Sequence, residues 1–276
     1  MSTAAHTVTV PRLEHVGRVT QAHVLRSEWT KLRSLRSTRW ALLVATVLGI
    51  GLSVVFAFVL SSRWGHLSPH ERADRHPLDV ALAGVNVAQL AIGVLGVLVI
   101  TGEYSTGMIR STFVAVPKRL PVLWAKAVVF AAVSCVLMLP SVLVAFFASQ
   151  AILGRHHILQ ISFGHPGVAR SVIGGAVYLM LIGIFALGLG AIVRNTAGGI
   201  ATFAAIMFVI PPLMNLLPTS WNNAITQYLP SDAGRSLFSL SPGNHHLSPG
   251  AGAALFCGYI AVTLAIAAVL LMRRDT

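Results

Sequence analysis

Charged side chains are scarce in this sequence. Asp, Glu, Lys and Arg make up 10% of its 276 residues, whereas a soluble domain carries about 25%. Hydrophobic residues make up 55% of the chain, and the mean hydropathy is +0.76. The missing charge reflects long uncharged runs, and a run of about 20 apolar residues spans a bilayer core. The composition therefore excludes an ordinary soluble domain and predicts a polytopic membrane protein.

Acidic residues are the rarest charged group, with 8 Asp and Glu against 20 Lys and Arg. The resulting net charge of +12 would suit a nucleic-acid partner. However, the basic residues stand at the edges of the apolar runs, where membrane topology signals occur. The charge pattern therefore predicts membrane lipid, and no nucleic acid, as the partner of these residues.

Cysteine is nearly absent, and clustered metal ligands are absent too. Cys135 and Cys257 both fall within apolar runs, which predicts buried small side chains and neither a disulfide nor a metal pair. Adjacent histidines occur at His156-His157 and His245-His246. Such pairs rarely converge on a metal without carboxylate or cysteine support, so no metal site is predicted.

Catalytic and energy-supplying groups are missing from the apolar runs. These runs contain serines such as Ser53, Ser134 and Ser141 but no histidine and no acid, which argues against an intramembrane hydrolase. Two basic residues, Lys126 and Arg170, lie about one turn inside the runs, and we expect each to snorkel to an interface. No G-x-x-x-x-G-K-[ST] phosphate loop occurs. The chain is therefore predicted to be no enzyme and to hold no cofactor, with any energy for transport coming from outside it.

Six apolar runs are present, and each must be a helix because a backbone in lipid satisfies its own hydrogen bonds. The fold class is thus predicted as all-α with six transmembrane helices, near residues 40–60, 80–100, 122–149, 168–193, 197–217 and 249–272. Residues 1–39 form a cytoplasmic N-terminus, and residues 40–276 form the transmembrane domain. A basic stretch longer than a signal peptide's leader precedes the first run, so no cleavable signal peptide is expected.

The orientation follows from the distribution of Lys and Arg. With the N-terminus in the cytoplasm, the inner segments hold fourteen of these residues and the outer segments hold six. The positive-inside rule then places both termini in the cytoplasm, which agrees with an even number of spans. The predicted location is the cytoplasmic (inner) membrane.

The segment 19–39 is predicted to form an amphipathic helix before the first span. Leu25, Trp29, Leu32 and Leu35 recur at helical spacing, and such a helix lies in the membrane interface with its basic groups on lipid headgroups. The pattern is imperfect, since Glu28 falls within the apolar arc. The chain is expected to turn into the membrane at residues 37–38. The alternative is a solvated basic leader.

The loop 101–121 follows the second span and has the composition of a short helix. Tyr104 and Met108 share one face at i, i+4, Arg110 and Phe113 reach outward, and Pro117 ends the segment. A polar loop of this size, held between two membrane helices, is suited to pass motion from a soluble partner to the spans. An ordinary solvated connector is the alternative.

Small and polar residues line one face of the second span, at Asn86, Gln89, Gly93 and Gly96. Such residues let helices approach closely and hydrogen-bond to each other, and they also suit a substrate path. Both interpretations stay open. Proline in the third span (Pro140) and in the fifth (211–212) predicts kinks or breaks.

Two segments of this sequence resemble a known family. Ser27-Glu-Trp-Thr-Lys-Leu-Arg-Ser followed by Ser37-Thr-Arg-Trp is similar to the start of type-two ABC export permeases. Gly102-Glu-Tyr-Ser-Thr-Gly-Met-Ile-Arg-Ser-Thr, then Val116-Pro-Lys-Arg, resembles their coupling region. The six-span pattern resembles the family over the whole chain, and these motifs cover about residues 27–40 and 102–126.

The resemblance implies the membrane-spanning subunit of an exporter, working as a homo- or heterodimer of permease subunits with two cytosolic ABC ATPase subunits that bind ATP and Mg. The connecting helix along the inner face would include Glu28, Trp29, Lys31 and Arg33. The coupling helix on the ATPase would include Glu103, Tyr104, Gly107, Met108 and Arg110. Residues 218–248 would fold partly into short re-entrant helices on the outer side, with an interfacial cap as the alternative. A non-transporting membrane anchor or assembly factor that recruits a cytosolic partner would use the same loop.

Overall fold

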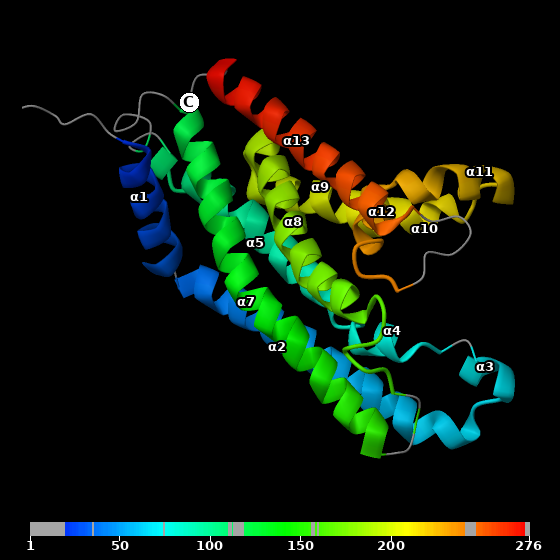
Figure 1. Ribbon diagram of the computed structural model, residues 1–276. Helices are drawn as coiled ribbons and strands as arrows, with labels where there is room; N and C mark the ends of the chain where they lie inside the picture. The colour runs from blue at the N-terminus through cyan, green and yellow to red at the C-terminus, as the bar shows by residue number, and fades with distance from the viewer. Residues whose placement is uncertain are drawn as a thin grey trace, which may run out of the picture.

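The computed structural model describes residues 20–34, 36–73, 75–109, 112, 119–155, 158, 160–240 and 247–273. Helices and their connections account for all of this part of the chain, in which no strand occurs (Figure 1). The helices, in chain order, are α1 (Gln21–Ser34), α2 (Arg36–Arg63), η1 (Trp64–His66), α3 (Pro69–Ala73), α4 (Pro77–Ala81), α5 (Val85–Ser105), α7 (Leu120–Arg155), α8 (Val168–Val193), α9 (Thr196–Ala204), η2 (Ala205–Val209), α10 (Ile210–Met214), α11 (Thr219–Ile225), η3 (Thr226–Tyr228), α12 (Pro230–Arg235) and α13 (Pro249–Arg273).

Six helical segments are long and apolar enough to cross a membrane, which confirms the predicted fold class. They are Arg36–His66, Pro77–Ser105, Leu120–Arg155, Val168–Val193, Thr196–Met214 and Pro249–Arg273. Each contains the core of one predicted run. The protein is therefore a multi-pass, all-α membrane protein.

The second span departs from the predicted continuous helix. A turn at residues 82–84 separates α4 from α5, because Gly84 lies against the backbone of α2. A Cβ at Gly84 would stand 1.8 Å from the carbonyl oxygen of Gly49. The Gly84 amide donates to Ser53 Oγ at 3.0 Å, which satisfies a buried amide at the interruption.

Proline acts differently in two of the spans. Helix α7 continues through Pro140 without a break, so only the chain around Pro211-Pro212 shows the predicted interruption. There α9 gives way to the π-helix η2 immediately before α10. Proline lacks an N–H and its ring crowds the carbonyl one turn earlier, and a widened turn relieves both defects.

The core of the bundle is the contact between α5 and α8. In the most apolar 18-residue stretch of each span, 61% and 67% of the residues are buried for α5 and α8, against 22% for α2 and 17% for Thr196–Met214. Helix α8 also packs on α7 and α13, while α2 lies along α7 (Figure 1). One end of the bundle gathers α1, the start of α7 and the end of α13, and the other end gathers α3, α4 and the end of α2 (Figure 1).

Glycine permits the close α5–α8 contact. A Cβ at Gly96 would lie 2.3 Å from the carbonyl oxygen of Gly183 and 3.2 Å from the Ala186 methyl group. No side chain fits in that space, and backbone approach of this kind drives helix association in membranes.

We expect Gly96→Ala to lower the free energy of unfolding by about 1–3 kcal/mol, because the added methyl group overpacks the contact. The measurement is SDS titration of the purified chain. Gly51→Ala in α2 is the matched control, since a Cβ there meets no atom within 4 Å. Equal stability of the two variants would contradict the tight α5–α8 contact.

Candidate functional site

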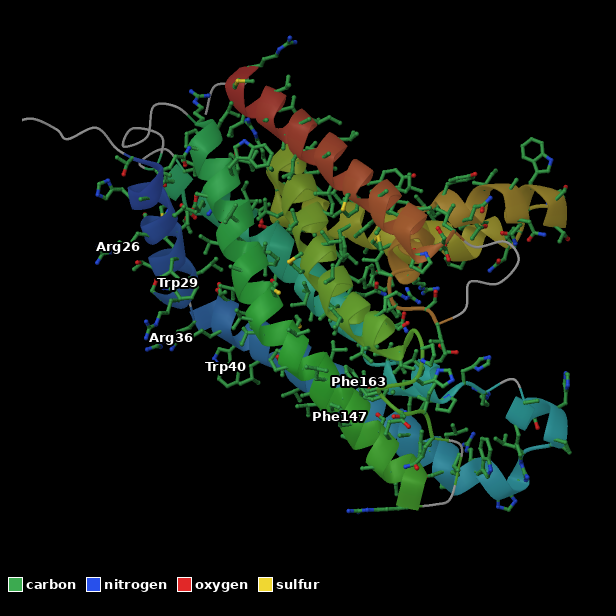
Figure 2. The ribbon with its side chains drawn as sticks, in the orientation of Figure 1. Arg26, Trp29, Arg36, Trp40, Phe147 and Phe163 are labelled. Atoms are coloured by element: carbon green, nitrogen blue, oxygen red, sulfur yellow. The ribbon has the colours of Figure 1, made fainter. Side chains whose placement is uncertain are left out.

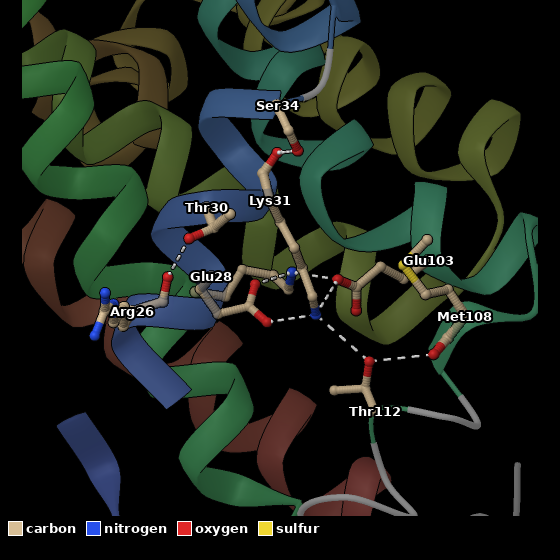
Figure 3. Close-up of polar contacts among 9 residues, drawn as sticks. Arg26, Glu28, Thr30, Lys31, Ser34, Glu103, Met108 and Thr112 are labelled. Carbon is tan, nitrogen blue, oxygen red and sulfur yellow. Dashed lines mark hydrogen bonds and ion pairs between the residues drawn. The ribbon is translucent and has the colours of Figure 1, made fainter. Parts of the chain in front are cut away.

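Four charged side chains from three helices meet at the end of the bundle that carries α1. Lys31 Nζ donates to Glu28 Oε1 at 2.7 Å and to Glu103 Oε1 at 2.9 Å (Figure 3). Lys126 Nζ donates to Glu28 Oε2 at 2.6 Å and to Glu103 Oε1 at 3.0 Å. The four residues form a closed ring of alternating charge, which we call the charge cluster. It joins α1 to the last turns of α5 and the first turns of α7.

The charge cluster is largely shielded from solvent. The side-chain exposures are 2% for Glu28, 3% for Lys126, 9% for Glu103 and 25% for Lys31. Two carboxylates balance two ammonium groups, so the cluster has no net charge. Burial of a single ion costs several kcal/mol, and a buried charge persists when its partners and hydrogen bonds offset that cost.

Helix α1 turns its acidic residue inward. Its buried residues are Val24, Glu28 and Leu32, at i, i+4 and i+8. Of the predicted apolar arc, Leu32 is buried and Leu25 packs against the core, but Trp29 is 47% exposed. Glu28 therefore takes an inner position, where it has two lysine partners, while Trp29 stays at the outer surface.

The end of α1 also differs from the prediction. Helix α1 ends at Ser34 and α2 begins at Arg36, so the chain enters the first span earlier than residues 37–38. Arg33 is exposed, and Trp40 is 65% exposed on the outer side of α2 (Figure 2). Leu35, which was assigned to the apolar arc, lies outside the described residues.

Glu103 pairs with two lysines of this chain, Lys31 and Lys126. Its Oε1 accepts from both Lys31 and Lys126, while its buried Oε2 has no hydrogen bond within the described part of the chain. Pairing of Glu103 with a cation on an ATPase stays a prediction. Lys126 was expected to snorkel to the interface, and instead it bonds the two buried carboxylates.

Beyond Glu103, the chain turns sharply out of α5. Helix α5 ends at Ser105, and Gly107 adopts φ 70°, in the left-handed region that favours glycine. The turn leads to Met108, whose side chain is 46% exposed. Thr112 Oγ1 donates to the Met108 carbonyl at 3.1 Å and lies 3.4 Å from Lys31 Nζ, from which it accepts (Figure 3). The loop therefore returns to the charge cluster.

The remaining residues of the predicted coupling loop lie partly outside the described structure. Tyr104 is half-buried, and the Arg194 guanidinium lies 5.4 Å from the centre of its ring, within the range of a cation–π contact. Arg110, Phe113 and Pro117 lie outside the described residues.

Two arginines fix the end of α13 near the charge cluster. Arg194 Nη2 donates to the Leu270 carbonyl at 3.0 Å, and Arg119 Nη1 donates to the Leu271 carbonyl at 3.1 Å. These carbonyls belong to the last turn of α13, where the helix dipole attracts cations. Neither arginine was a candidate from the sequence.

The polar face of the second span packs against neighbouring helices. Gln89 accepts from the Tyr178 hydroxyl of α8 and donates to the Asn86 carbonyl at 2.9 Å. A Cβ at Gly93 would stand 2.0 Å from the Phe203 ring of α9, and Gly96 lies against α8 as described above. These contacts favour the helix-packing interpretation, and a role in lining a substrate path stays a prediction.

Lys31 keeps its positive charge at neutral pH. Burial of Lys31 opposes its charge, but hydrogen bonds and attraction from Glu28 and then Glu103 prevail and raise the pKa of Lys31 above 10.5. A raised lysine pKa contributes stability that is complete below the unfolded value and is lost as the pH rises through the folded value. Titration of Lys31 therefore loosens α1 only in strong alkali.

Comparison with known proteins assigns the chain to no family. No protein-family model matches the chain, and no curated protein matches it significantly. Among the described residues, no three His, Cys, Asp or Glu side chains lie together as metal ligands. The histidine pairs at 156–157 and 245–246 lie outside those residues. The class that fold and composition define is a multi-pass membrane protein with a buried ionic cluster at one end.

We expect Lys126→Met to lower the free energy of unfolding by about 3–5 kcal/mol, because it leaves the two buried carboxylates with one lysine. The double variant Glu28→Gln/Lys126→Met keeps the balanced Lys31–Glu103 pair, so it is expected to recover most of that loss. The measurement is SDS titration of the single and double variants as a double-mutant cycle.

Additive losses in this cycle would contradict the cluster, since independent side chains show no coupling. Arg155→Met is the control for removal of a basic residue, because Arg155 is exposed at the opposite end of α7. It is expected to leave stability unchanged within about 0.5 kcal/mol.

Proposed function

We propose that this chain is the membrane-spanning permease subunit of an ATP-driven exporter. The observation that carries the proposal is the charge cluster, which ties α1 to α5 and α7 beside the loop between them. ATP and Mg would bind a separate cytosolic ATPase, as the resemblance implies. The chain itself would move an unidentified substrate across the cytoplasmic membrane.

The arrangement supports transmission of force from a partner to the spans. Met108 is exposed at the turn beyond α5, and Thr112 returns the loop to Lys31. A partner that docks on the turn would push directly on the ends of α5 and α7. Because the buried ion pairs also hold α1, we infer that these three helices would move together rather than slide past each other.

The outer faces of the bundle leave room for a second permease subunit. The spans Arg36–His66 and Thr196–Met214 are the least buried of the six. Either face would contact lipid or the paired subunit. Between the Thr196–Met214 span and α13, the chain forms three short helices, α11, η3 and α12, which fall within residues 218–248. A re-entrant position for these helices at the outer surface stays part of the proposal.

Both termini are proposed to lie in the cytoplasm, as the basic residues predict. In a background with Cys135 and Cys257 replaced by alanine, we expect a membrane-impermeant maleimide to label His66→Cys in intact cells. We expect Thr30→Cys to react only after the membrane is opened, because α1 would then lie inside. The measurement is labelling before and after permeabilisation, and the reverse pattern would invert the topology.

We expect Met108→Glu to reduce recovery of an ATPase partner by about tenfold or more, because a new carboxylate would be buried without a partner in the docked turn. The measurement is mild-detergent purification of the tagged chain from its native cells, followed by an assay of the eluate for ATP hydrolysis.

His66→Glu places the same carboxylate at the other end of the bundle, where His66 is exposed, and it serves as the matched control. ATPase recovery unchanged by Met108→Glu would refute docking at this turn. A wild-type chain recovered without any ATPase would favour the membrane anchor or assembly factor over the exporter.

A further inference from the structure

A cavity lies at the end of the bundle opposite the charge cluster. Its volume is 420 Å³, which falls within the range of about 300–1,000 Å³ for small-molecule sites. The apolar part is formed by the last turns of α2, including Phe56 and Val59, and by Val80 of α4. None of the candidate residues drawn from the sequence lines it.

The mouth of this cavity is charged. Arg63, Arg75, His76 and Asp79 line it together with the apolar residues. Among the described residues that line the cavity, the charges of Arg63, Arg75 and Asp79 sum to +1. An apolar interior with a cationic mouth matches a molecule that has a hydrocarbon chain and an anionic head.

The two arginines of the mouth are available to a ligand. Arg72, one turn away, donates to the Gly65 carbonyl at 3.2 Å and lies over the Trp64 ring at 5.8 Å. Nearby Glu71 bonds the Ser68 amide and hydroxyl, which lower its pKa, and the charge of Arg75 lowers that pKa further. By contrast, no hydrogen bond or ion pair within the described residues engages the side chains of Arg63 or Arg75, and both are exposed.

The location of the cavity favours a lipid as its occupant. Arg63 is the last residue of a membrane-spanning helix, a depth at which phospholipid headgroups lie and at which arginine snorkels. Guanidinium groups bind phosphate through paired, charge-assisted hydrogen bonds. We propose that this cavity binds one acidic phospholipid, with its phosphate on Arg63 and Arg75 and an acyl chain between α2 and α4.

Asp79 affects which lipid headgroup the cavity favours. A zwitterionic lipid would place its ammonium group on this carboxylate, whereas an acidic lipid would be repelled by it. The excess positive charge of the mouth favours the acidic lipid. Only the placement of the site in the outer leaflet rests on the proposed orientation, while binding itself is independent of the exporter hypothesis.

The test is native mass spectrometry of the purified full-length chain, titrated with phosphatidylglycerol or with phosphatidylethanolamine of the same acyl chains. We expect phosphatidylglycerol to bind about tenfold more tightly. Arg63→Ala/Arg75→Ala is expected to weaken its binding by about tenfold or more, since each charge-assisted hydrogen bond contributes that order of affinity. Asp79→Asn is expected to strengthen it.

Two further variants separate the headgroup from the chain. Arg155→Ala removes a basic residue at the same end that does not line the cavity, and it is expected to bind phosphatidylglycerol like the wild type. Val59→Trp fills the apolar part and is expected to abolish lipid binding while the arginines remain.

Equal affinity for the two lipids, or weaker binding in Asp79→Asn, would overturn the acidic-lipid assignment. Displacement of the lipid by millimolar inorganic phosphate, with Val59→Trp still binding phosphate, would show a site for free phosphate instead. Export or ATPase defects in these variants play no part in the test, so it stands even where the exporter hypothesis fails.

Discussion

The balance of charge among four side chains, three buried and Lys31 partly exposed, is the constraint on which this end of the molecule depends. Two carboxylates and two ammonium groups occupy a site with little access to water, and each is tolerated only because its neighbours carry the opposite sign. The constraint is shared by three helices that are distant in the sequence. Helix α1 stays against α5 and α7 as long as all four charges are present, and no apolar contact of α1 is as specific as these ion pairs.

The loop after α5 and the last turn of α13 are held by hydrogen bonds at the same end of the bundle. Thr112 brings the chain after α5 back to Lys31, while Arg119 and Arg194 hold the last turn of α13. Tyr104 lies beneath Arg194 and thereby links the end of α5 to the end of α8. All six spans have a terminus within this polar network or beside it, and the fifth joins it where Thr196 Oγ1 donates to Thr101 Oγ1 at 3.0 Å. The opposite end carries the short helices α3 and α4 and the cavity.

The sequence predicted the six spans because hydrophobic runs and helix formation in lipid are local properties, and each run was found as a helical span, continuous in four cases and interrupted in the second and the fifth. It could not predict how the polar residues pair. Glu28 looked like a flaw in an apolar arc, and Lys126 looked like a lysine that snorkels, because a residue's partner 98 positions away is invisible to helical periodicity. Two signals were nevertheless present: an acid and a base at i, i+3 in α1, and a lone lysine inside an apolar run. The interruption at Gly84 depended on a close backbone contact with α2, which no local pattern records.

The arginine contacts at the end of α13 bear on how this sequence can vary. Arg119 and Arg194 bond the carbonyls of Leu270 and Leu271, not their side chains. A carbonyl is contributed by every residue type, so these two contacts leave the identities of positions 270 and 271 open and restrict only the arginines. These two hydrogen bonds at the last turn of α13 thus depend on Arg119 and Arg194 and not on which side chains stand at positions 270 and 271.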